Sequence, residues 1–177
     1  MAVLQTIRNF FLPAVEPEVE IIVPAPFTTY EIKTLTIKDI DSLMRLNLRC
    51  FKKGENYTKY TFNYLLTQPQ SLGRAAVTPT NDMVGFVLVM NNADGAAHIT
   101  TVGVAPEHRR RGVAAILIEN MEKTLRKKGV STVVLEVRVG NTAAQDLYLS
   151  RNYTLVKRMK RYYHNGEDGF LMMKSLV

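Results

Sequence analysis

The segment from Ala97 to Glu119 contains residue types at a spacing that would bind a pyrophosphate. An apolar strand leads into a turn containing Pro106, three consecutive arginines follow, and an apolar-striped helix begins directly after them. Gly112 and Ala114 leave room for a ligand to approach the backbone, while the first N–H groups of the helix and its dipole attract anions. Arg109 and its two neighbours add positive charge at the same point. The pattern Arg109-x-x-Gly112-x-Ala114 therefore predicts an anion-binding turn.

Two common phosphate-binding motifs do not describe this turn, and an ordinary solvated Arg-rich turn is the alternative. No Gly-Lys-Ser or Gly-Lys-Thr follows, as a Walker loop would require, and the GxGxxG pattern is missing. The turn resembles instead the Arg/Gln-x-x-Gly-x-Gly/Ala signature of the GNAT acyl-CoA-dependent acetyltransferase superfamily. This resemblance implies acetyl-CoA as co-substrate, no metal, and coenzyme contacts at Val102, Val104, Arg109, Arg110, Arg111, Gly112, Val113 and Ala114.

The second half of the chain resembles one branch of that superfamily, the N-terminal protein acetyltransferases. Residues 135–144 read LEVRVGNTAA and lead to Leu147 and Tyr148, and residues 161–169 read RYYHNGEDG. Both are similar to the LxVRxSNxAAxxLY and Tyr-Tyr-x-x-Gly-Glu-Asp patterns of this family. The loop 55–57 (ENY) and the strand 98–100 (HIT) resemble its archaeal and eukaryotic alanine/serine-type catalytic subunits. The resemblance covers roughly residues 29–177.

Two positions depart from the family pattern. Gly140 stands where a serine is frequent, and Arg151-Asn152-Tyr153 replaces a frequent Leu-Gly-Phe after the helix. Because asparagine tolerates a left-handed helix end better than other residues apart from glycine, we expect the turn at Asn152 to survive.

The resemblance implies direct attack of an amine on the acetyl thioester, without a covalent enzyme intermediate. This reaction needs a base for the amine, a hydrogen-bond donor for the thioester oxygen and an acid for the departing thiolate. The family places the donor on the strand backbone near Val104 and suggests Tyr148 as the acid and as a further coenzyme contact. Asn141 is expected to cap its helix and, by resemblance, to contact the coenzyme.

Three residues compete to be the base. The bacterial ribosomal-protein acetyltransferases favour Glu136, whereas the archaeal and eukaryotic relatives suggest Glu55 and His98. Strand alternation places Glu136 and Arg138 on one face of their strand, with Leu135 and Val137 on the other. The sequence leaves the choice open, and a shared role through ordered water is compatible with it.

A free α-amine is the substrate that a modest base suits best. Its pKa of about 7.7–8.0 means that deprotonation at pH 7 costs about 1 kcal/mol, against about 4.6 kcal/mol for a lysine near 10.4. Tyr57, Tyr162 and Tyr163 are expected to flank the entrance and hold the peptide backbone, together with Arg138. We therefore predict an enzyme that acetylates protein N-termini. An enzyme acetylating lysine or a small amine, and a non-catalytic acyl-CoA or ribosome-binding module, are the alternatives.

Composition indicates one globular domain. At 177 residues, 46% of them hydrophobic, the chain can bury a core without disulfides or metals. It has one cysteine, and no window approaches the roughly 18 apolar residues of a membrane span, so we expect a cytoplasmic protein without a membrane partner. The net charge of +7 suits weak ribosome association but does not indicate dedicated nucleic-acid binding. The sequence leaves the oligomeric state open.

Periodicity and turn residues place these candidates on alternating strands and helices. Four of the seven prolines lie in the first 26 residues, so we interpret residues 1–28 as an extension and 29–177 as the domain. Thr36-x-x-Asp39 resembles a capping box before a helix with an apolar face of Ile40, Leu43, Met44, Leu48 and Phe51. The order of the expected strands and helices along the chain predicts an α/β protein with a mixed, mostly antiparallel sheet flanked by helices, as in the GNAT fold. We expect strands at 30–35, 74–77, 84–91, 97–104, 132–139, 155–163 and 169–176, and helices after residue 36, ending near 69, at 112–128, and from 141.

Overall fold

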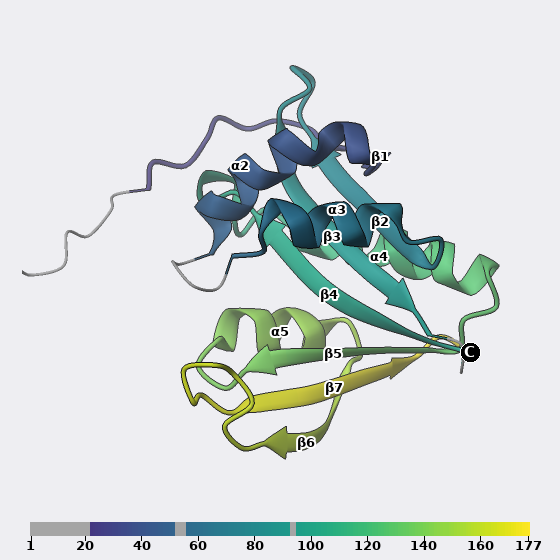
Figure 1. The fold of residues 1–177 in the computed structure, drawn as a ribbon. Helices are drawn as coiled ribbons and strands as arrows, with labels where there is room; N and C mark the ends of the chain where they lie inside the picture. The colour runs from purple at the N-terminus through teal and green to yellow at the C-terminus, as the bar shows by residue number, and fades with distance from the viewer. Residues whose placement is uncertain (1–21, 52–55, 93–94) are drawn as a thin grey trace, which may run out of the picture.

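The computed structural model describes residues 22–51, 56–92 and 95–177, and it confirms the expected α/β class. One seven-stranded sheet carries helices on both faces (Figure 1). The elements in chain order are β1 (Glu31–Thr34), η1 (Ile37–Asp39), α2 (Ile40–Cys50), α3 (Lys59–Thr67), β2 (Ser71–Val77), β3 (Met83–Asn91), β4 (Ala96–Val104), η2 (Pro106–His108), α4 (Val113–Lys127), β5 (Thr132–Arg138), α5 (Thr142–Ser150), β6 (Thr154–Met159) and β7 (Gly169–Ser175).

The sheet is mixed and mostly antiparallel, as predicted. Its strand order is β1-β2-β3-β4-β5-β7-β6, and only the β4–β5 pair is parallel. This pair is short: it joins Ala96 to Thr132, Ala97 to Val133 and His98 to Val134, and then ends. Beyond His98 the two strands separate, as Figure 1 shows, so the backbone of β4 from Ile99 onward has no paired strand on that side.

Two glycines identify which helix covers which face of the sheet. A Cβ on Gly85 would come within 2.9 Å of Val113 in α4, whereas a Cβ on Gly103 would lie 3.1 Å from Cys50 in α2. The helices α2 and α3 therefore cover one face and α4 covers the other (Figure 1). Bare backbone at these positions lets the helices approach the strands closely.

The first helical segment begins with the predicted capping box, although its apolar face differs from the prediction. The Thr36 N–H donates to Asp39 Oδ2 at 2.8 Å, which starts the turn η1 that leads into α2. Leu43 is buried as expected, but Leu48 is 60% exposed, so its placement in the core was wrong. Asn47, a polar residue of the same helix, is buried. Its Nδ2 donates to the Tyr57 carbonyl at 3.0 Å, and this hydrogen bond fixes the chain before α3.

The helix α4 has the predicted apolar stripe, and a glycine follows its C-terminal end. Leu117, Ile118, Met121 and Leu125 are all buried against the sheet. Gly129 takes a left-handed φ of 77°, a conformation that glycine adopts without strain at a helix end.

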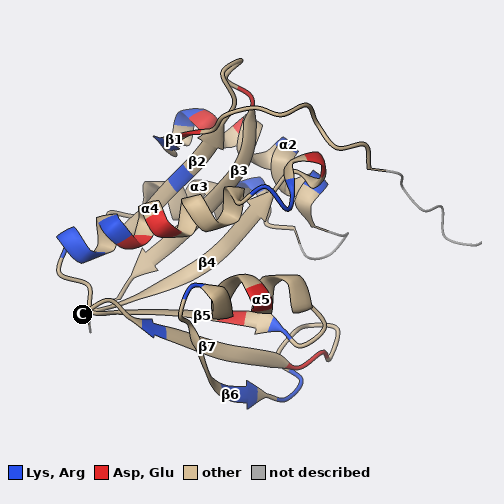
Figure 2. Ribbon diagram, turned by 180° about the vertical axis from the view of Figure 1, so that it is seen from behind, with Lys and Arg blue, Asp and Glu red and all other residues tan. Residues whose placement is uncertain are grey.

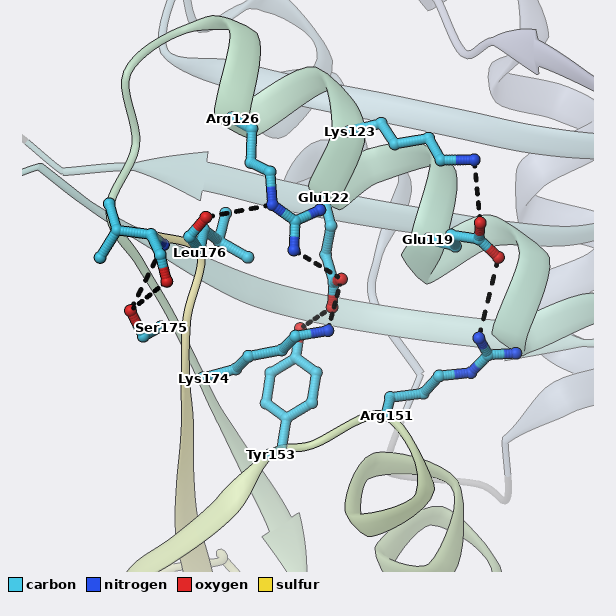
Figure 3. Close-up of polar contacts among 10 residues, drawn as sticks. Glu119, Glu122, Lys123, Arg126, Arg151, Tyr153, Lys174, Ser175 and Leu176 are labelled. Carbon is cyan, nitrogen blue, oxygen red and sulfur yellow. Dashed lines mark hydrogen bonds and ion pairs between the residues drawn. The ribbon is translucent and has the colours of Figure 1, made fainter.

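A buried polar cluster joins α4 to the C-terminal part of the sheet (Figure 3). Glu122 of α4 accepts a hydrogen bond from the Tyr153 hydroxyl at 3.0 Å and pairs with Lys174 of β7 at 2.6 Å. Tyr153 also packs edge-on against Tyr148 of α5, with ring centroids 5.5 Å apart. Through these contacts α5 lies on the α4 side of the sheet.

The strand predicted for residues 155–163 ends at Met159 in the structure. The chain turns there because Asp168 accepts hydrogen bonds from Arg158 Nε at 2.7 Å and from the Arg161 N–H at 2.8 Å. Tyr162 and Tyr163 therefore lie in the connection between β6 and β7 rather than on a strand. Asn152 adopts a φ of 65°, which confirms the expected left-handed turn after α5.

No helix among the described residues is long and apolar enough to cross a membrane.

Candidate active site

The predicted anion-binding turn lies between the end of β4 and the start of α4. Gly112 is the N-cap of α4 and has a left-handed φ of 77°, and a Cβ placed there would meet no atom within 4 Å. The first N–H groups of the helix lack partners within it, so they are available to an anion in this open space. The local geometry therefore suits a pyrophosphate.

The three arginines beside this turn have different partners. Arg109 donates to the carbonyls of Val104 at 3.2 Å and Cys50 at 3.1 Å, which ties the end of β4 to the end of α2. Arg111 donates to the carbonyls of residues 25 and 26, so it holds the preceding chain segment against the turn. Arg110, at a left-handed φ of 61°, makes no side-chain hydrogen bond or ion pair among the described residues. Of the three guanidinium groups, that of Arg110 is thus the one available to a ligand.

A cavity of about 990 Å³ extends from this turn along the gap between β4 and β5. It is large enough for a cofactor-sized ligand. Of the ten residues expected to contact the coenzyme, Arg111 alone does not line it. The other nine do: Val102, Val104, Arg109, Arg110, Gly112, Val113, Ala114, Asn141 and Tyr148. Asn141 also caps α5 as predicted, since its Oδ1 accepts from the Ala144 N–H at 3.1 Å.

Tyr148 lies in the wall of this cavity on the α4 side of the sheet. Its side chain is only 8% exposed and packs against Tyr153. Burial raises the pKa of Tyr148, so its hydroxyl stays protonated at neutral pH. The cavity wall therefore holds a protonated hydroxyl that can donate to a ligand.

His98 and Glu136, two of the three candidate bases, are in direct contact. His98 Nε2 lies 2.6 Å from Glu136 Oε2, with the two side chains 32% and 20% exposed. The contact forms at the point where the parallel pairing of β4 and β5 ends, because His98 is opposite Val134, two residues before Glu136. A hydrogen-bonded imidazole and carboxylate at the mouth of the gap can accept a proton.

Tyr57 stands beside this pair on the face covered by α2 and α3. Its hydroxyl donates to the Thr100 carbonyl of β4 at 3.1 Å, and its ring packs against Phe62 of α3. Burial, and then the nearby charge of Glu136, raise the pKa of Tyr57. Tyr57 and Glu136 therefore face the same space.

The two tyrosines of the β6–β7 connection lie over the same face. A Cβ on Gly169 would come within 3.2 Å of Tyr162 and 3.3 Å of Tyr163. The Arg138 guanidinium stacks on the Tyr163 ring at 3.9 Å. Burial, and then the charge of Glu136, raise the pKa of Tyr162, while burial raises that of Tyr163 to about 12. The structure thus brings Tyr57, Tyr162, Tyr163 and Arg138 together around the His98–Glu136 pair.

Comparison with known proteins identifies the family. Residues 40–153 match the model of the "Acetyltransferase (GNAT) family". An "N-alpha-acetyltransferase" of Sulfolobus acidocaldarius is 31% identical over 160 residues, which are 83% of this chain and 93% of the relative. The "N-alpha-acetyltransferase daf-31" of Caenorhabditis elegans is 34% identical, over 82% of each chain. The chain belongs to the GNAT acetyltransferase family.

A solved structure of the same fold is also similar to this GNAT acetyltransferase. It is a chain in the "Crystal structure of the NatC complex bound to Gag peptide and CoA", with a TM-score of 0.74 and 25% identity. The match covers 84% of this chain and 99% of that chain. The chain is therefore similar over most of its length to acetyltransferases, and acetyl transfer is its activity.

Glu167 is a residue of this GNAT site that the sequence analysis did not assign. One carboxylate oxygen accepts from the Gly140 N–H at 2.9 Å, and the other pairs with Arg138 at 2.8 Å. The Gly140 N–H and then Arg138 hold the pKa of Glu167 below its usual range. The Gly-Glu-Asp motif was the signal that could have identified it.

Glu55, the third candidate base, lies outside the described residues. Among the residues that are described, no group of three or more His, Cys, Asp or Glu side chains could hold a metal ion.

Proposed function

We propose that this GNAT acetyltransferase transfers the acetyl group of acetyl-CoA to the free α-amino group of protein N-termini. One observation carries the proposal: the His98–Glu136 pair forms where the parallel pairing of β4 and β5 ends, on the two strands that also supply Val102, Val104 and Arg138 to the cofactor-sized cavity. Two relatives at 31% and 34% identity are named N-alpha-acetyltransferases. A similar structure was solved with a peptide and CoA, which supports a site that takes both.

Acetyl-CoA would supply the activated acetyl group, and the residues of the cavity fit it. The N-terminus of α4, with Gly112 and Arg110, would bind the pyrophosphate. The backbone of β4 at Val102 and Val104 would hold the thioester end, because β4 has no strand partner there on its β5 side. Asn141 would contact the coenzyme from the start of α5.

Tyr148 would protonate the departing thiolate from the cavity wall. Because burial raises its pKa, the hydroxyl is protonated at neutral pH and can donate to the sulfur as negative charge builds there. The backbone N–H groups at the free end of β4 would donate to the thioester oxygen as charge builds there.

The His98–Glu136 pair would accept the proton of the incoming amine. Deprotonating an α-amine at pH 7 costs about 1 kcal/mol, so a solvent-connected pair is sufficient, whereas a lysine would require about 4.6 kcal/mol. The side chains of Tyr57, Tyr162, Tyr163 and Arg138 would flank the peptide and position its first residue. Glu55 remains a third candidate base, and the described residues do not include it.

Nascent or finished polypeptides in the cytoplasm are the substrates that we propose. Weak association with the ribosome would suit the net charge of +7 and bring the enzyme near new N-termini.

The first experiment measures CoA release from acetyl-CoA with two peptide sets. One set has free N-termini beginning with Ser, Ala or Met and contains no lysine, and the other has blocked N-termini and one internal lysine. Turnover of the first set alone is the expected result. Turnover of the blocked lysine peptides alone would instead support a lysine acetyltransferase, and turnover of neither set would contradict the proposal.

A further inference from the structure

An open sheet face leads away from Glu136 across β7 to β6. Glu136 is opposite Leu171 of β7, and Leu171 is opposite Lys157 of β6. Residues directly opposite in antiparallel strands point to the same face, so Lys157 lies on the face of Glu136, about 10 Å away at two strand spacings. Met173 lies on the same face in the neighbouring row, opposite Val134, and is 36% exposed. This part of the sheet face is therefore accessible to a ligand.

This row ends in an excess of positive charge, which Asp168 offsets only in part because that carboxylate faces Arg158 as well as Lys160. Lys157, Lys160 and Arg161 are exposed, and their side chains make no hydrogen bond or ion pair within the described part of the chain. The two carboxylates nearby have other partners. Asp168 binds Arg158 and the Arg161 backbone, and Glu167 binds Arg138 and the Gly140 backbone.

Most other cations of this protein have an explanation within the fold. Lys33, Arg49, Lys59, Lys123, Arg126, Arg151 and Lys174 are all paired with carboxylates. Lys127 and Lys128 are at the end of α4, where cations suit the helix dipole. In Figure 2 the basic end of α4 lies on one side of the molecule, and the basic residues of β6 and the turn after it lie on another. The latter group, Lys157, Lys160 and Arg161, has no helix end to explain it; we call it the basic rim.

We propose that the basic rim selects substrate polypeptides with acidic residues at about the fourth to sixth positions. The inference rests on the proposed function. A peptide whose α-amine lies at Glu136 rises about 3.3 Å per residue when extended, so its fourth residue reaches Lys157. Tyr162 directly follows Arg161 in the sequence, so the tyrosines that would hold the first residues adjoin the rim.

An acidic peptide fits this surface better than a nucleic acid. The rim has three cations, of which register places Lys157 in the row of Glu136, and this is fewer than the 6–10 phosphate contacts of a strongly salt-dependent nucleic-acid complex. The row from Glu136 to Lys157 also starts at the proposed proton acceptor, and the α-amine of a peptide substrate has to lie there.

The test compares three lysine-free peptides that share their first three residues and a free N-terminus. Positions four to six are Glu, Gln or Arg. At low salt we expect kcat/KM to be about threefold to tenfold higher for the Glu peptide than for the Gln peptide, from two or three exposed ion pairs. The Arg peptide should be poorer than both. The preference should largely disappear in 0.5 M KCl, because added salt shortens the screening length.

Two variants locate the effect on the rim. Lys157→Gln combined with Lys160→Gln should bring the Glu-to-Gln ratio close to one, and Lys157→Glu should favour the Arg peptide. Lys127→Gln combined with Lys128→Gln removes the same charge at the far end of the molecule and should keep the ratio. Because all four lysines are exposed, folding is not at risk.

The outcomes separate this inference from the proposed function. Equal acetylation of all three peptides would overturn the rim proposal and leave α-amine acetylation intact. No acetylation of any peptide would overturn both. Tight binding of a short single-stranded RNA, lost in the rim variant while the peptides remain equivalent, would assign the rim to RNA instead.

Discussion

Replacing Lys174 by methionine should reveal how much the buried cluster of Figure 3 contributes to stability. Lys174 Nζ lies 2.6 Å from Glu122 Oε2, and the two side chains are 13% and 6% exposed. Removing one partner of a buried ion pair costs about 3–5 kcal/mol, because the other charge is left without compensation. Here Arg126 remains 3.9 Å from Glu122, and the Tyr153 hydroxyl still donates to it. We therefore expect a loss near the lower limit, about 3 kcal/mol.

Urea unfolding and thermal melting measure this loss directly. For a domain of this size about 3 kcal/mol corresponds to a Tm lower by about 6–12 °C. Lys123→Met, which breaks an exposed pair with Glu119 on the same helix, is the matched control. Its side chains are 65% and 47% exposed, so we expect less than about 1 kcal/mol.

A double variant decides whether the uncompensated charge is the cause. Glu122→Gln combined with Lys174→Met removes both charges and keeps an acceptor for the Tyr153 hydroxyl. It should recover stability to within about 1 kcal/mol of the parent, since a buried pair can be replaced at little cost. A Lys174→Met loss below about 1 kcal/mol, or a double variant as unstable as the single one, would refute this reasoning.

Three further predictions concern the site and its surroundings. Glu136→Gln should slow α-amine acetylation at pH 7 but much less at pH 9, where the amine deprotonates unaided; equal losses at both pH values would remove the pair from the base role. Tyr148→Phe should lower kcat about 100-fold with little change in acetyl-CoA affinity, while Tyr153→Phe, which removes a neighbouring buried hydroxyl, should keep kcat. Undiminished turnover by Tyr148→Phe would contradict its assignment. Burial lowers the pKa of His108 in the folded protein. Below about pH 6.5 the unfolded chain therefore binds a proton at His108 more readily than the folded chain does, and the free energy of unfolding falls as the pH decreases. Urea unfolding at pH 7.0 and 5.5 should show a smaller loss in His108→Asn, and an unchanged loss would exclude His108 as the cause.

The local part of the site could be predicted from the sequence because its signals are local. The turn before α4 is specified by Gly112 and its arginines within a few residues, and Asn141 caps the next helix directly. Strand alternation likewise placed Leu135 on the buried face and Glu136 on the accessible one. The turn and the cap follow from residue types a few positions apart, and the strand faces follow from backbone periodicity.

The partners of the arginines and the contact of His98 with Glu136 could not be predicted in this way. Arg109 bonds to the Cys50 carbonyl, 59 positions away in the sequence, and Arg111 bonds to residues before the first strand. The His98–Glu136 contact requires the short parallel register that ends at His98 and Val134. Long-range register is a property of the whole sheet, and no local pattern in the chain specifies it.

The same short register explains how the two halves of the proposed chemistry can meet. Glu136 faces the side of α2 and α3, whereas Tyr148 faces the side of α4, so a continuous sheet would separate them. Because β4 and β5 separate beyond His98, a thioester held on the free backbone of β4 would be accessible from both faces. The amine could then approach from the tyrosine side while the thiolate departs beside Tyr148. The short register that ends at His98 and Val134 would thus contribute to the proposed site alongside the residues that would move the protons.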